Sequence, residues 1–247
     1  MIPDKGFIKE ELASSGLCPC IHTFETVDST NNVARELAAE ADEDILVISS
    51  EQTAGKGTHG RSFFSPDSTG LYFSAVFSGL SVSHPVTFAA GVASVKALRH
   101  LGIETSMKWV NDIITDGRKA GGILCERLSS GKVIIGIGIN LSAPRSGFPD
   151  EIKATAAELG LSPEVRDILA VHLYRELAEA VRSEPVAVLD AYRAVCGTIG
   201  RHITFDGIGG RAGGTALAVD DDGALLVRTD SGEDVRLESG FVSVRYE

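Results

Sequence analysis

Lys119 is the side chain of this sequence with the clearest chemical setting. The pair Asp116-Gly117, between two apolar runs, predicts a two-residue hairpin turn that places Asp112 opposite Gly121. Because side chains alternate along a strand, Asp112 and Lys119 would share one face, roughly 7–8 Å apart. A lysine beside a glycine could bridge a carboxylate and a phosphate as charge develops between them. The alternative is an exposed hairpin with an ordinary, weak ion pair.

A glycine-rich loop from Gly55 to Arg61 carries further cationic residues. Its spacing matches a dinucleotide-binding fingerprint, which must open a helix. Pro66 and Gly70 follow here, so the sequence argues against a long helix at this point. Accessible glycine N–H groups, with the charges of Lys56 and Arg61, still favour binding of an anion. A solvated, flexible loop is the alternative.

The run from Val133 to Asn140 predicts a strand whose two faces differ. One face is β-branched throughout, whereas the other carries Gly136 and Gly138. Two glycines on one face indicate close approach of a ligand or of another backbone. A bulge or a tight crossing of the sheet explains the pattern equally well. Asn140, at the end of the glycine face, could read the edge of a ring or cap a turn.

The elements that must hold these residues alternate between helices and strands. Ser29 and Thr30 are good N-cap types for one helix, and Ser83 can cap a second that runs to about Leu101. The sequence also predicts strands at 45–50, 71–77 and within 105–140, and helices at 163–182 and 185–195. We therefore expect an α+β fold over residues 1–196, with a mixed, largely antiparallel sheet and flanking helices.

The composition changes after Gly197. Short strand-like runs alternate there with turn-forming pairs, namely Asp206-Gly207, Gly213-Gly214, Asp222-Gly223, Ser231-Gly232 and Ser239-Gly240. This spacing predicts a small all-β barrel over residues 197–247, as a second domain. The acidic tract 220–223 is interpreted as a hairpin turn, because it lacks the spaced ligands of a calcium loop.

Charge and composition exclude several classes of protein. The 247 residues carry a formal net charge of -11, which argues against a general nucleic-acid binder. Four cysteines occur without a CxxC pair, as expected of a reduced, cytoplasmic protein. The N-terminal residues lack the apolar region of a signal peptide, and no apolar run reaches membrane-spanning length.

Taken together and in order, these segments resemble the biotin–protein ligase family. Residues 26–31 are similar to the family's DSTN segment, and 51–61 to its GRGRxGR signature. Residues 108–126 look like KWPND followed by KxxGIL and an acidic residue, and 136–140 match GIGIN. The tail from 214 to 243 resembles the family's SH3-like C-terminal barrel. Each motif is weak alone, whereas the ordered set over about residues 23–247 is specific.

The resemblance implies a class II synthetase-like catalytic domain that uses ATP and Mg²⁺ to activate biotin as biotinoyl-AMP. A lysine of a carrier protein would then attack the adenylate. Lys119 and Arg61 match catalytic positions. Biotin-pocket positions are matched by Ser29, Thr30, Asn31, Gln52, Lys56, Gly57, Thr58, Lys119, Gly121 and Gly138. Nucleotide-side positions are matched by Lys56, Arg61, Asn111, Asp112, Lys119 and Asn140, with Asp112 as a metal contact.

The chain departs from the family pattern in the glycine loop. Lys56 stands where the first arginine is usual, so the bidentate fork of arginine is lost. Thr58 replaces a residue that is often basic, and Phe63 stands where tryptophan is common. We hypothesise that this loop holds the adenylate with fewer charged contacts than a more basic loop would.

Other functions stay open at this stage. A lipoate–protein ligase or octanoyltransferase looks similar in fold, although KWxND, KxGGIL and the barrel favour biotin. A non-catalytic biotin sensor or a binding module built on the barrel are further alternatives. The segment before Thr23 is too short for a DNA-binding module, so we expect a monofunctional enzyme without a DNA partner. The expected partner is the biotin carboxyl carrier domain of a carboxylase, and a homodimer is possible.

Overall fold

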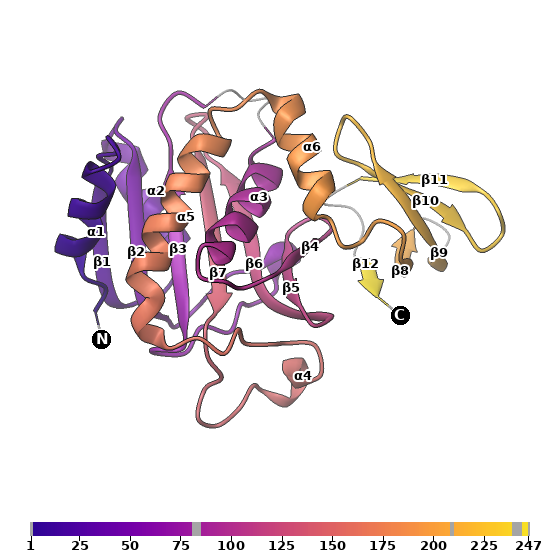
Figure 1. Ribbon diagram of the computed structural model, residues 1–247, viewed down its shortest axis with the longest axis horizontal. Coiled ribbons are helices and arrows are strands. Elements are labelled where there is room, and N and C mark those ends of the chain that lie inside the picture. The colour runs from indigo at the N-terminus through magenta and orange to yellow at the C-terminus, as the bar shows by residue number, and fades with distance from the viewer. Residues whose placement is uncertain (1, 81–84, 208–209, 239–243, 247) are drawn as a thin grey trace.

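A seven-stranded mixed sheet forms the centre of the first part of the chain (Figure 1). The computed structural model describes residues 2–80, 85–207, 210–238 and 244–246. The strands run in the spatial order β1 (Cys20–Val27), β2 (Ile45–Gln52), β3 (Gly70–Val76), β7 (Val133–Asn140), β6 (Arg118–Arg127), β5 (Asp112–Thr115) and β4 (Ser106–Lys108). Only β1 and β2 pair in parallel among the described strands of this sheet, so the prediction of a largely antiparallel sheet is confirmed.

The helices flank this sheet on both faces. They are α1 (Lys5–Ala13), α2 (Thr30–Glu40), α3 (Val86–Arg99), the single turn α4 (Asp150–Lys153), α5 (Arg166–Ala180) and α6 (Pro185–Val195), with short 3-10 turns at Thr58–Gly60 and Pro163–Val165. Apart from α1 and α4, the helices match those expected from the sequence. The expected cap Ser83 lies outside the described residues. None of the helices in the described ranges is long and apolar enough to cross a bilayer.

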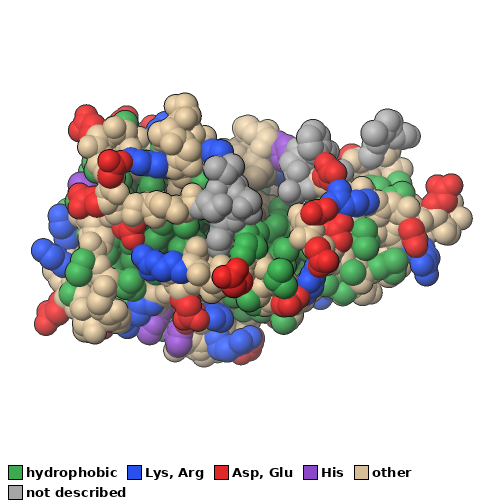
Figure 2. Space-filling model, turned by 90° about the horizontal axis from the view of Figure 1, so that it is seen from above, with side chains coloured by type: hydrophobic (Ala, Val, Ile, Leu, Met, Phe, Trp, Pro, Cys, Tyr) green, Lys and Arg blue, Asp and Glu red, His purple; other side chains and the backbone are tan. Residues whose placement is uncertain are grey.

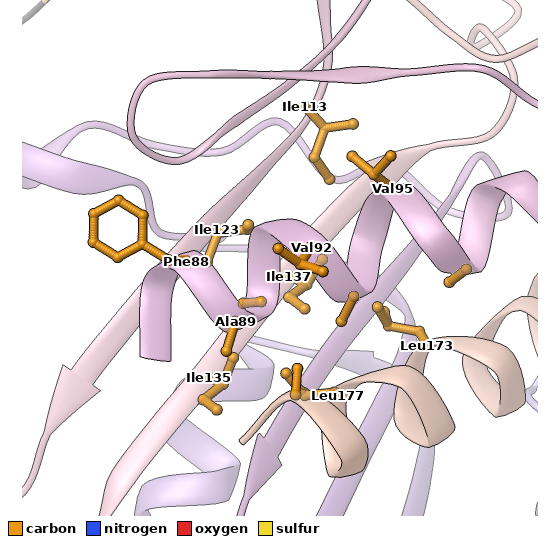
Figure 3. Packing of buried hydrophobic residues seen from close by; sticks show 14 of the residues in the cluster. Phe88, Ala89, Val92, Val95, Ile113, Ile123, Ile135, Ile137, Leu173 and Leu177 are labelled. Atoms are coloured by element: carbon orange, nitrogen blue, oxygen red, sulfur yellow. The ribbon is translucent and has the colours of Figure 1, made fainter. Parts of the chain in front are cut away.

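The main core lies between the sheet and the helices α3 and α5. Figure 3 shows α3 side chains such as Val92 packed toward Ile135 and Ile137 of β7 and toward Leu173 of α5. Val133, Ile135, Ile137 and Ile139 all face this core, as the β-branched side of the strand predicts. The opposite side of β7, with its two glycines, therefore faces α2 and the functional site.

Helix α2 covers the other face of the sheet. It begins after Ser29, and its Ala34 and Ala38 pack against Ile45 and Val47 of β2. At its C-terminal end, Lys132 Nζ donates to the carbonyls of Ala38 (2.8 Å) and Ala41 (2.5 Å), which otherwise lack helical partners. These bonds hold the C-terminal end of α2, while residues of its first turn line the functional site.

The C-terminal part is a five-stranded antiparallel sheet. Its order is β11 (Asp234–Leu237), β10 (Leu225–Thr229), β9 (Gly210–Val219), β8 (His202–Gly207) and β12 (Val244–Tyr246). Within the described ranges the sheet does not close on itself, so the barrel stays a prediction, and Ser239-Gly240 lies outside those ranges. The turn expected at Gly213-Gly214 is wrong, because both glycines lie inside β9, where Gly214 packs against the Arg228 carbonyl.

The surface mixes both signs of charge. On the face seen in Figure 2, acidic and basic side chains are interspersed over both parts of the molecule. Several of the acidic side chains are paired with arginines, as between Arg236 and Asp220 or between Arg228 and Asp234. Each such pair is locally neutral, and surface ion pairs of this kind individually contribute little to stability.

Candidate active site

The hairpin β5–β6 carries Lys119 and closes as the sequence predicts. Asp116 and Gly117 both have positive φ angles, 47° and 75°, as a type I′ turn requires. Beyond the turn the register shifts, so that Ala120 is an extra residue and Asp112 pairs with Gly122. The expected pairing of Asp112 with Gly121 is therefore wrong, because a β-bulge moves the partner by one residue.

The bulge decides which glycine faces the site. A Cβ on Gly121 would lie 2.6 Å from the Gly138 carbonyl oxygen, on the side away from the pocket. A Cβ on Gly122 would instead lie 3.1 Å from Lys119 Nζ, so Gly122 takes the place expected for Gly121. Lys119 and Asp112 share one face as predicted, and their Nζ and Oδ1 atoms are 2.5 Å apart.

A narrow pocket lies between α2, the glycine face of the sheet and the glycine loop. Gly136 approaches the Asn31 side-chain oxygen, and a Cβ on Gly138 would lie 2.5 Å from the Phe63 ring. The pocket is lined by Ser29, Thr30, Asn31, Gln52, Lys56, Gly57, Thr58, Phe63, Phe73, Asn111, Lys119, Gly122, Ile123, Leu124, Gly136, Ile137 and Gly138. The two glycines of β7 are thus explained by close approach of side chains and not by a bulge.

Buried polar groups form the back wall of the narrow pocket. Gln52 Oε1 accepts hydrogen bonds from Thr30 N (2.8 Å) and Thr30 Oγ1 (3.1 Å). Ser74 Oγ donates to Asn31 Oδ1 at 2.6 Å, while Asn31 Nδ2 donates to Glu126 Oε2 at 2.6 Å. These bonds fix donors and acceptors in an apolar surrounding, which is how ligand pockets orient a small molecule. Ser74 was not identified from the sequence, and Glu126, the acidic residue that ends the motif over 108–126, was given no place in the pocket.

The glycine loop folds back on itself beside this pocket. Gly57 N donates to the Arg61 carbonyl at 2.7 Å, and Phe63 N donates to the Gly55 carbonyl at 2.8 Å. Lys56 Nζ reaches Asn32 Oδ1 on α2. Arg61 turns toward Thr58 instead, donating to its carbonyl and hydroxyl oxygens, and is absent from the lining of both pockets. No long helix follows the loop, as the sequence indicates.

A second, wider pocket lies on the other side of Lys119 and Phe63. Its lining comprises Glu51, Gln52, Thr53, Ala54, Gly55, Ser62, Phe63, Phe64, Ser65, Pro66, Lys119, Asn140, Phe148, Pro149, Glu151, Ile152, Thr155 and Ala156. Gln52, Phe63 and Lys119 line both pockets. The lysine amine therefore stands where the two spaces meet.

The loop between β7 and α5 supplies one wall of the wider pocket and was not identified from the sequence. It also holds the backbone of Lys119, whose N–H donates to the Thr155 carbonyl (2.7 Å) and whose carbonyl accepts from Ala157 N (2.8 Å). Phe148 and Ile152 are isolated apolar residues in a loop rich in glycine and proline. This is the feature of the sequence that could have indicated the wall.

Of the six residues expected on the nucleotide side, Asn111, Asp112 and Asn140 lie apart from one another. Asn140 lines the wider pocket and donates to the Ala157 carbonyl at 3.0 Å. Asn111 lines the narrow pocket instead and donates to the Ile123 carbonyl at 2.9 Å. Asp112 pairs with Lys119, and its other oxygen lies 3.9 Å from Lys108 Nζ. Among described residues no group of three His, Cys, Asp or Glu side chains could hold a metal.

A tyrosine beneath the wider pocket steadies the loop that carries Phe63. Tyr72 is almost fully buried, and its hydroxyl donates to the Pro66 carbonyl at 2.9 Å. Burial raises the pKa of Tyr72, with a smaller opposing contribution from its hydrogen bond with Thr69. The hydroxyl therefore keeps its proton and remains a donor to this loop at any working pH.

Comparison with known proteins decides the family. Residues 23–140 match the model of the biotin/lipoate A/B protein ligase family, and residues 198–245 match the biotin protein ligase C terminal domain. A bifunctional ligase/repressor BirA from Bacillus spizizenii is 34% identical over 84% of this chain and 69% of its own length. This chain belongs to the biotin/lipoate A/B protein ligase family.

Further members of the ligase family agree with this assignment. A biotin–[acetyl-CoA-carboxylase] ligase from Mycobacterium tuberculosis is 30% identical over 91% of this chain and 89% of its own length. The fold is similar to that of a biotin protein ligase from Aquifex aeolicus, solved with biotin and ATP, at a TM-score of 0.75 and 24% identity, covering 92% of this chain and 99% of that one. The likeness in fold thus extends over both parts of the molecule.

Proposed function

We propose that this chain activates biotin with ATP to biotinyl-5'-AMP and then transfers the biotinyl group to a lysine of a carrier protein. The observation that carries the proposal is the position of Lys119, whose amine lies where the narrow and the wide pocket meet. An acid in one pocket and a nucleotide in the other would bring a carboxylate and a phosphate to the same lysine. Membership of the ligase family supports this assignment of the two pockets.

Biotin would occupy the narrow pocket. Its rings would lie over Gly122 and Gly138, where a side chain would block them, and its polar edge would meet the wall formed by Thr30 and by Asn31, which covers Gly136. The cavity holds about 40 Å³, room for only a few water molecules. Since the Phe63 ring rests against Gly138, binding of biotin would require this ring to move.

The nucleotide would occupy the wider pocket. Phe148, Pro149 and Ile152 offer an apolar wall for a base. The amide of Asn140, the last residue of β7, lines the same pocket. An oxygen of the biotin carboxylate would form a bond to the α-phosphorus. The bond from phosphorus to the bridging oxygen would break, and pyrophosphate would leave with that electron pair.

Lys119 would stabilise this step by donating hydrogen bonds to both reacting groups. Its amine can contact the carboxylate and an α-phosphate oxygen together, and so offset the negative charge that brings them into repulsion. Residues 155–157 hold both main-chain groups of Lys119, and Asp112 contacts its amine, so the lysine is oriented before the substrates arrive. In the second step the neutral amine of a carrier lysine would attack the anhydride carbonyl. AMP would leave, and the amine would lose one proton.

A protein-bound magnesium site at Asp112 does not fit this geometry. One oxygen of Asp112 is held by Lys119 at 2.5 Å and the other lies near Lys108, so the carboxylate faces two cations. We therefore derive no step through a metal on Asp112. Mg²⁺ would enter as part of the MgATP substrate, since this ion is commonly bound through phosphates and only one or two carboxylates.

The carrier would be the biotin carboxyl carrier domain of a biotin-dependent carboxylase. This partner rests on the family and on relatives named as biotin–[acetyl-CoA-carboxylase] ligases. A lipoate or octanoate ligase is the alternative within the family, and the match of residues 198–245 to the biotin protein ligase C-terminal domain favours biotin.

The decisive experiment is ATP- and Mg²⁺-dependent transfer of labelled biotin to a purified carrier domain, by the native chain and by Lys119→Ala. Transfer that collapses in the variant supports both the activity and the role of the lysine. Parallel reactions with lipoate and octanoate test substrate choice. Binding of biotin without any adenylate or transfer would refute the ligase activity and identify a biotin sensor.

A further inference from the structure

Trp109 is the single tryptophan of the chain, and it joins the catalytic sheet to the C-terminal sheet. Its side chain is 5% exposed, and its indole Nε1 donates to the Gly223 carbonyl at 3.0 Å. Its backbone N–H donates to Thr198 Oγ1 at 2.9 Å. A buried indole N–H requires a partner, so the position of the Gly223 carbonyl constrains the position of Trp109.

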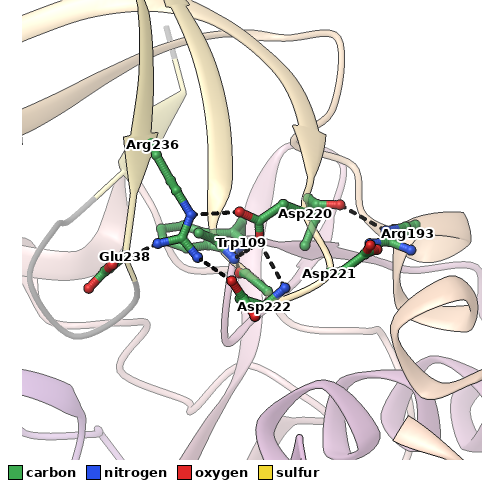
Figure 4. A network of polar contacts seen from close by, with 10 residues as sticks. Trp109, Arg193, Asp220, Asp221, Asp222, Arg236 and Glu238 are labelled. Atoms are coloured by element: carbon green, nitrogen blue, oxygen red, sulfur yellow. Dashed lines mark hydrogen bonds and ion pairs between the residues drawn. The ribbon is translucent and has the colours of Figure 1, made fainter. Parts of the chain in front are cut away.

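The Gly223 carbonyl belongs to the acidic turn 220–223, which has no part in the proposed reaction. Asp220 Oδ1 accepts from the backbone N–H groups of Asp222 (3.0 Å) and Ala224 (2.9 Å), and Gly223 has a φ angle of 85° (Figure 4). An aspartate that bonds to N–H groups two and four residues ahead fixes the shape of a turn. Asp220 thereby determines where the Gly223 carbonyl points.

Two arginines hold the turn from either side. Arg236 of β11 contacts Asp220 Oδ2 at 2.6 Å, and Arg193 of α6 contacts Asp221 at 2.7 Å and the Val219 carbonyl at 2.8 Å. Burial raises the pKa of Asp220, but hydrogen bonds from Arg236, Ala224 and Asp222 outweigh that effect and hold its pKa below the ordinary value. Because Arg193 lies on α6, the turn is anchored to a helix of the first part.

The segment that follows Trp109 leads to Asp112, the ion-pair partner of Lys119. The Val110 carbonyl accepts from Tyr192 Oη at 3.0 Å, and the Asn111 carbonyl accepts from Ile123 N at 2.9 Å. Asp112 then begins β5 and pairs with Lys119. A shift of Trp109 would therefore be passed to Asp112 through Val110 and Asn111, in the turn that joins β4 to β5.

We propose that Asp220 is a positioning residue for the reaction at Lys119, acting through the Gly223 carbonyl, Trp109 and Asp112. This inference rests on the proposed function and adds to it a role for the C-terminal sheet. Asp220 touches no substrate. It sets the turn that holds Trp109, and Trp109 sets the strand that orients the lysine.

The test compares Asp220→Ala with Asp220→Asn, which keeps the Oδ1 acceptor, and with the control Asp234→Ala. Asp234 lies on the same sheet and pairs with Arg228 (2.8 Å), but it is exposed and contacts no residue of the catalytic part in the described structure. Three measurements are made: the emission of Trp109, hydrogen exchange over residues 106–122, and the kinetics of ATP–pyrophosphate exchange. The first two do not depend on activity.

Asp220→Ala should red-shift the emission, speed exchange over 106–122, and lower kcat of adenylation between about 10- and 100-fold with a smaller change in KM for biotin. Asp220→Asn should recover most of the rate, and Asp234→Ala should match the native protein. A native rate in a folded Asp220→Ala with shifted emission overturns the proposal, as does unshifted emission.

A second variant keeps the proposal testable if Asp220→Ala does not fold. Trp109→Phe retains the ring and removes the indole N–H, so it should show the same faster exchange and slower adenylation. Native exchange and a native rate in Trp109→Phe would overturn the proposal. If the native chain makes no adenylate at all, the proposed function fails, whereas the emission and exchange data still decide whether the turn holds the hairpin.

Discussion

Lys119 Nζ and Asp112 Oδ1 approach to 2.5 Å across a hairpin whose register shifts by one residue between them. The shift coincides with the main-chain bonds of Lys119 to Thr155 and Ala157, which draw this residue toward the loop after β7. The side chain is held by a carboxylate and the backbone by a neighbouring loop. Lys119 is thus oriented from two independent directions.

Replacing Lys119 should remove most of the adenylation rate. We expect Lys119→Ala to lower kcat by about 10² to 10³, or about 2.7–4 kcal/mol, because the donor to both reacting groups is lost. Asp112→Asn should cost less, since the lysine remains. The exposed Lys9→Ala serves as the control, and ATP–pyrophosphate exchange is the measurement. A rate within twofold of native in Lys119→Ala would contradict the assignment.

The two neighbouring glycines of β6 should respond in opposite ways to the same substitution. Gly121→Ala places a Cβ against the Gly138 carbonyl, so we expect a loss of about 1–3 kcal/mol in the free energy of unfolding. Gly122→Ala meets the flexible end of Lys119 and, at an ordinary contact distance of 3.7 Å, the Phe63 ring, so stability should hold while kcat falls. Denaturant unfolding and adenylation assays check both, and the reverse pattern would show that Gly121 faces the pocket.

The glycine loop should release its adenylate faster than a more basic loop would. Thr58 lies beside Arg61, and an arginine at 58 adds a second cation where the loop meets the pocket. We expect Thr58→Arg to slow the dissociation of biotinyl-5'-AMP, as measured by rapid filtration of preformed complex. Ser15→Arg adds the same charge at an exposed position far from the loop. Equal release rates in all three proteins would reject the hypothesis.

The stability of the molecule should fall in mild acid because of His172. Its ring stacks on His100 with 4.7 Å between centroids, and burial, followed by the charges of His100 and Arg175, lowers the pKa of His172. The folded state therefore favours the neutral ring. The stabilisation is complete above the unfolded pKa of about 6.5, and it is lost as pH falls through the lower folded value.

The measurement for His172 is the urea midpoint between pH 5 and pH 8. His172→Gln should flatten the acidic part of this curve, whereas Ser15→Gln, which introduces the same side chain at an exposed position, should leave it in place. An identical slope for the native protein and His172→Gln would exclude His172 as its source.

Local pattern was sufficient for the parts of the site that depend on one element. The two-residue turn at Asp116-Gly117 follows from residue type, and the two faces of β7 follow from alternation. The N-terminal turn of α2 was likewise expected at Ser29, although this side chain makes no capping hydrogen bond in the structure. Each of these features is decided by neighbours in sequence.

Long-range contacts decided what the sequence did not predict. The bulge at Ala120 coincides with bonds between Lys119 and a loop 36 to 38 residues away, which no local pattern records. Phe148 and Ile152 are not part of a regularly spaced apolar pattern, so their place in the wider pocket depends on the path of the whole loop. The burial of Asn31 against Gly136 similarly requires α2 and β7 to be packed together.

The attachment of Lys119 to residues 155–157 has a consequence for how such a chain can diverge. The loop after β7 is held a second time beyond these residues, because Leu159 N donates to the Asn140 carbonyl and Leu161 N donates to the Leu141 carbonyl. The stretch 142–154 between these anchors can therefore gain, lose or exchange residues without displacing the lysine. New contacts to the wider pocket can be tried by mutation while Lys119 stays in place, so this loop is where we expect lineages to differ most in length and composition.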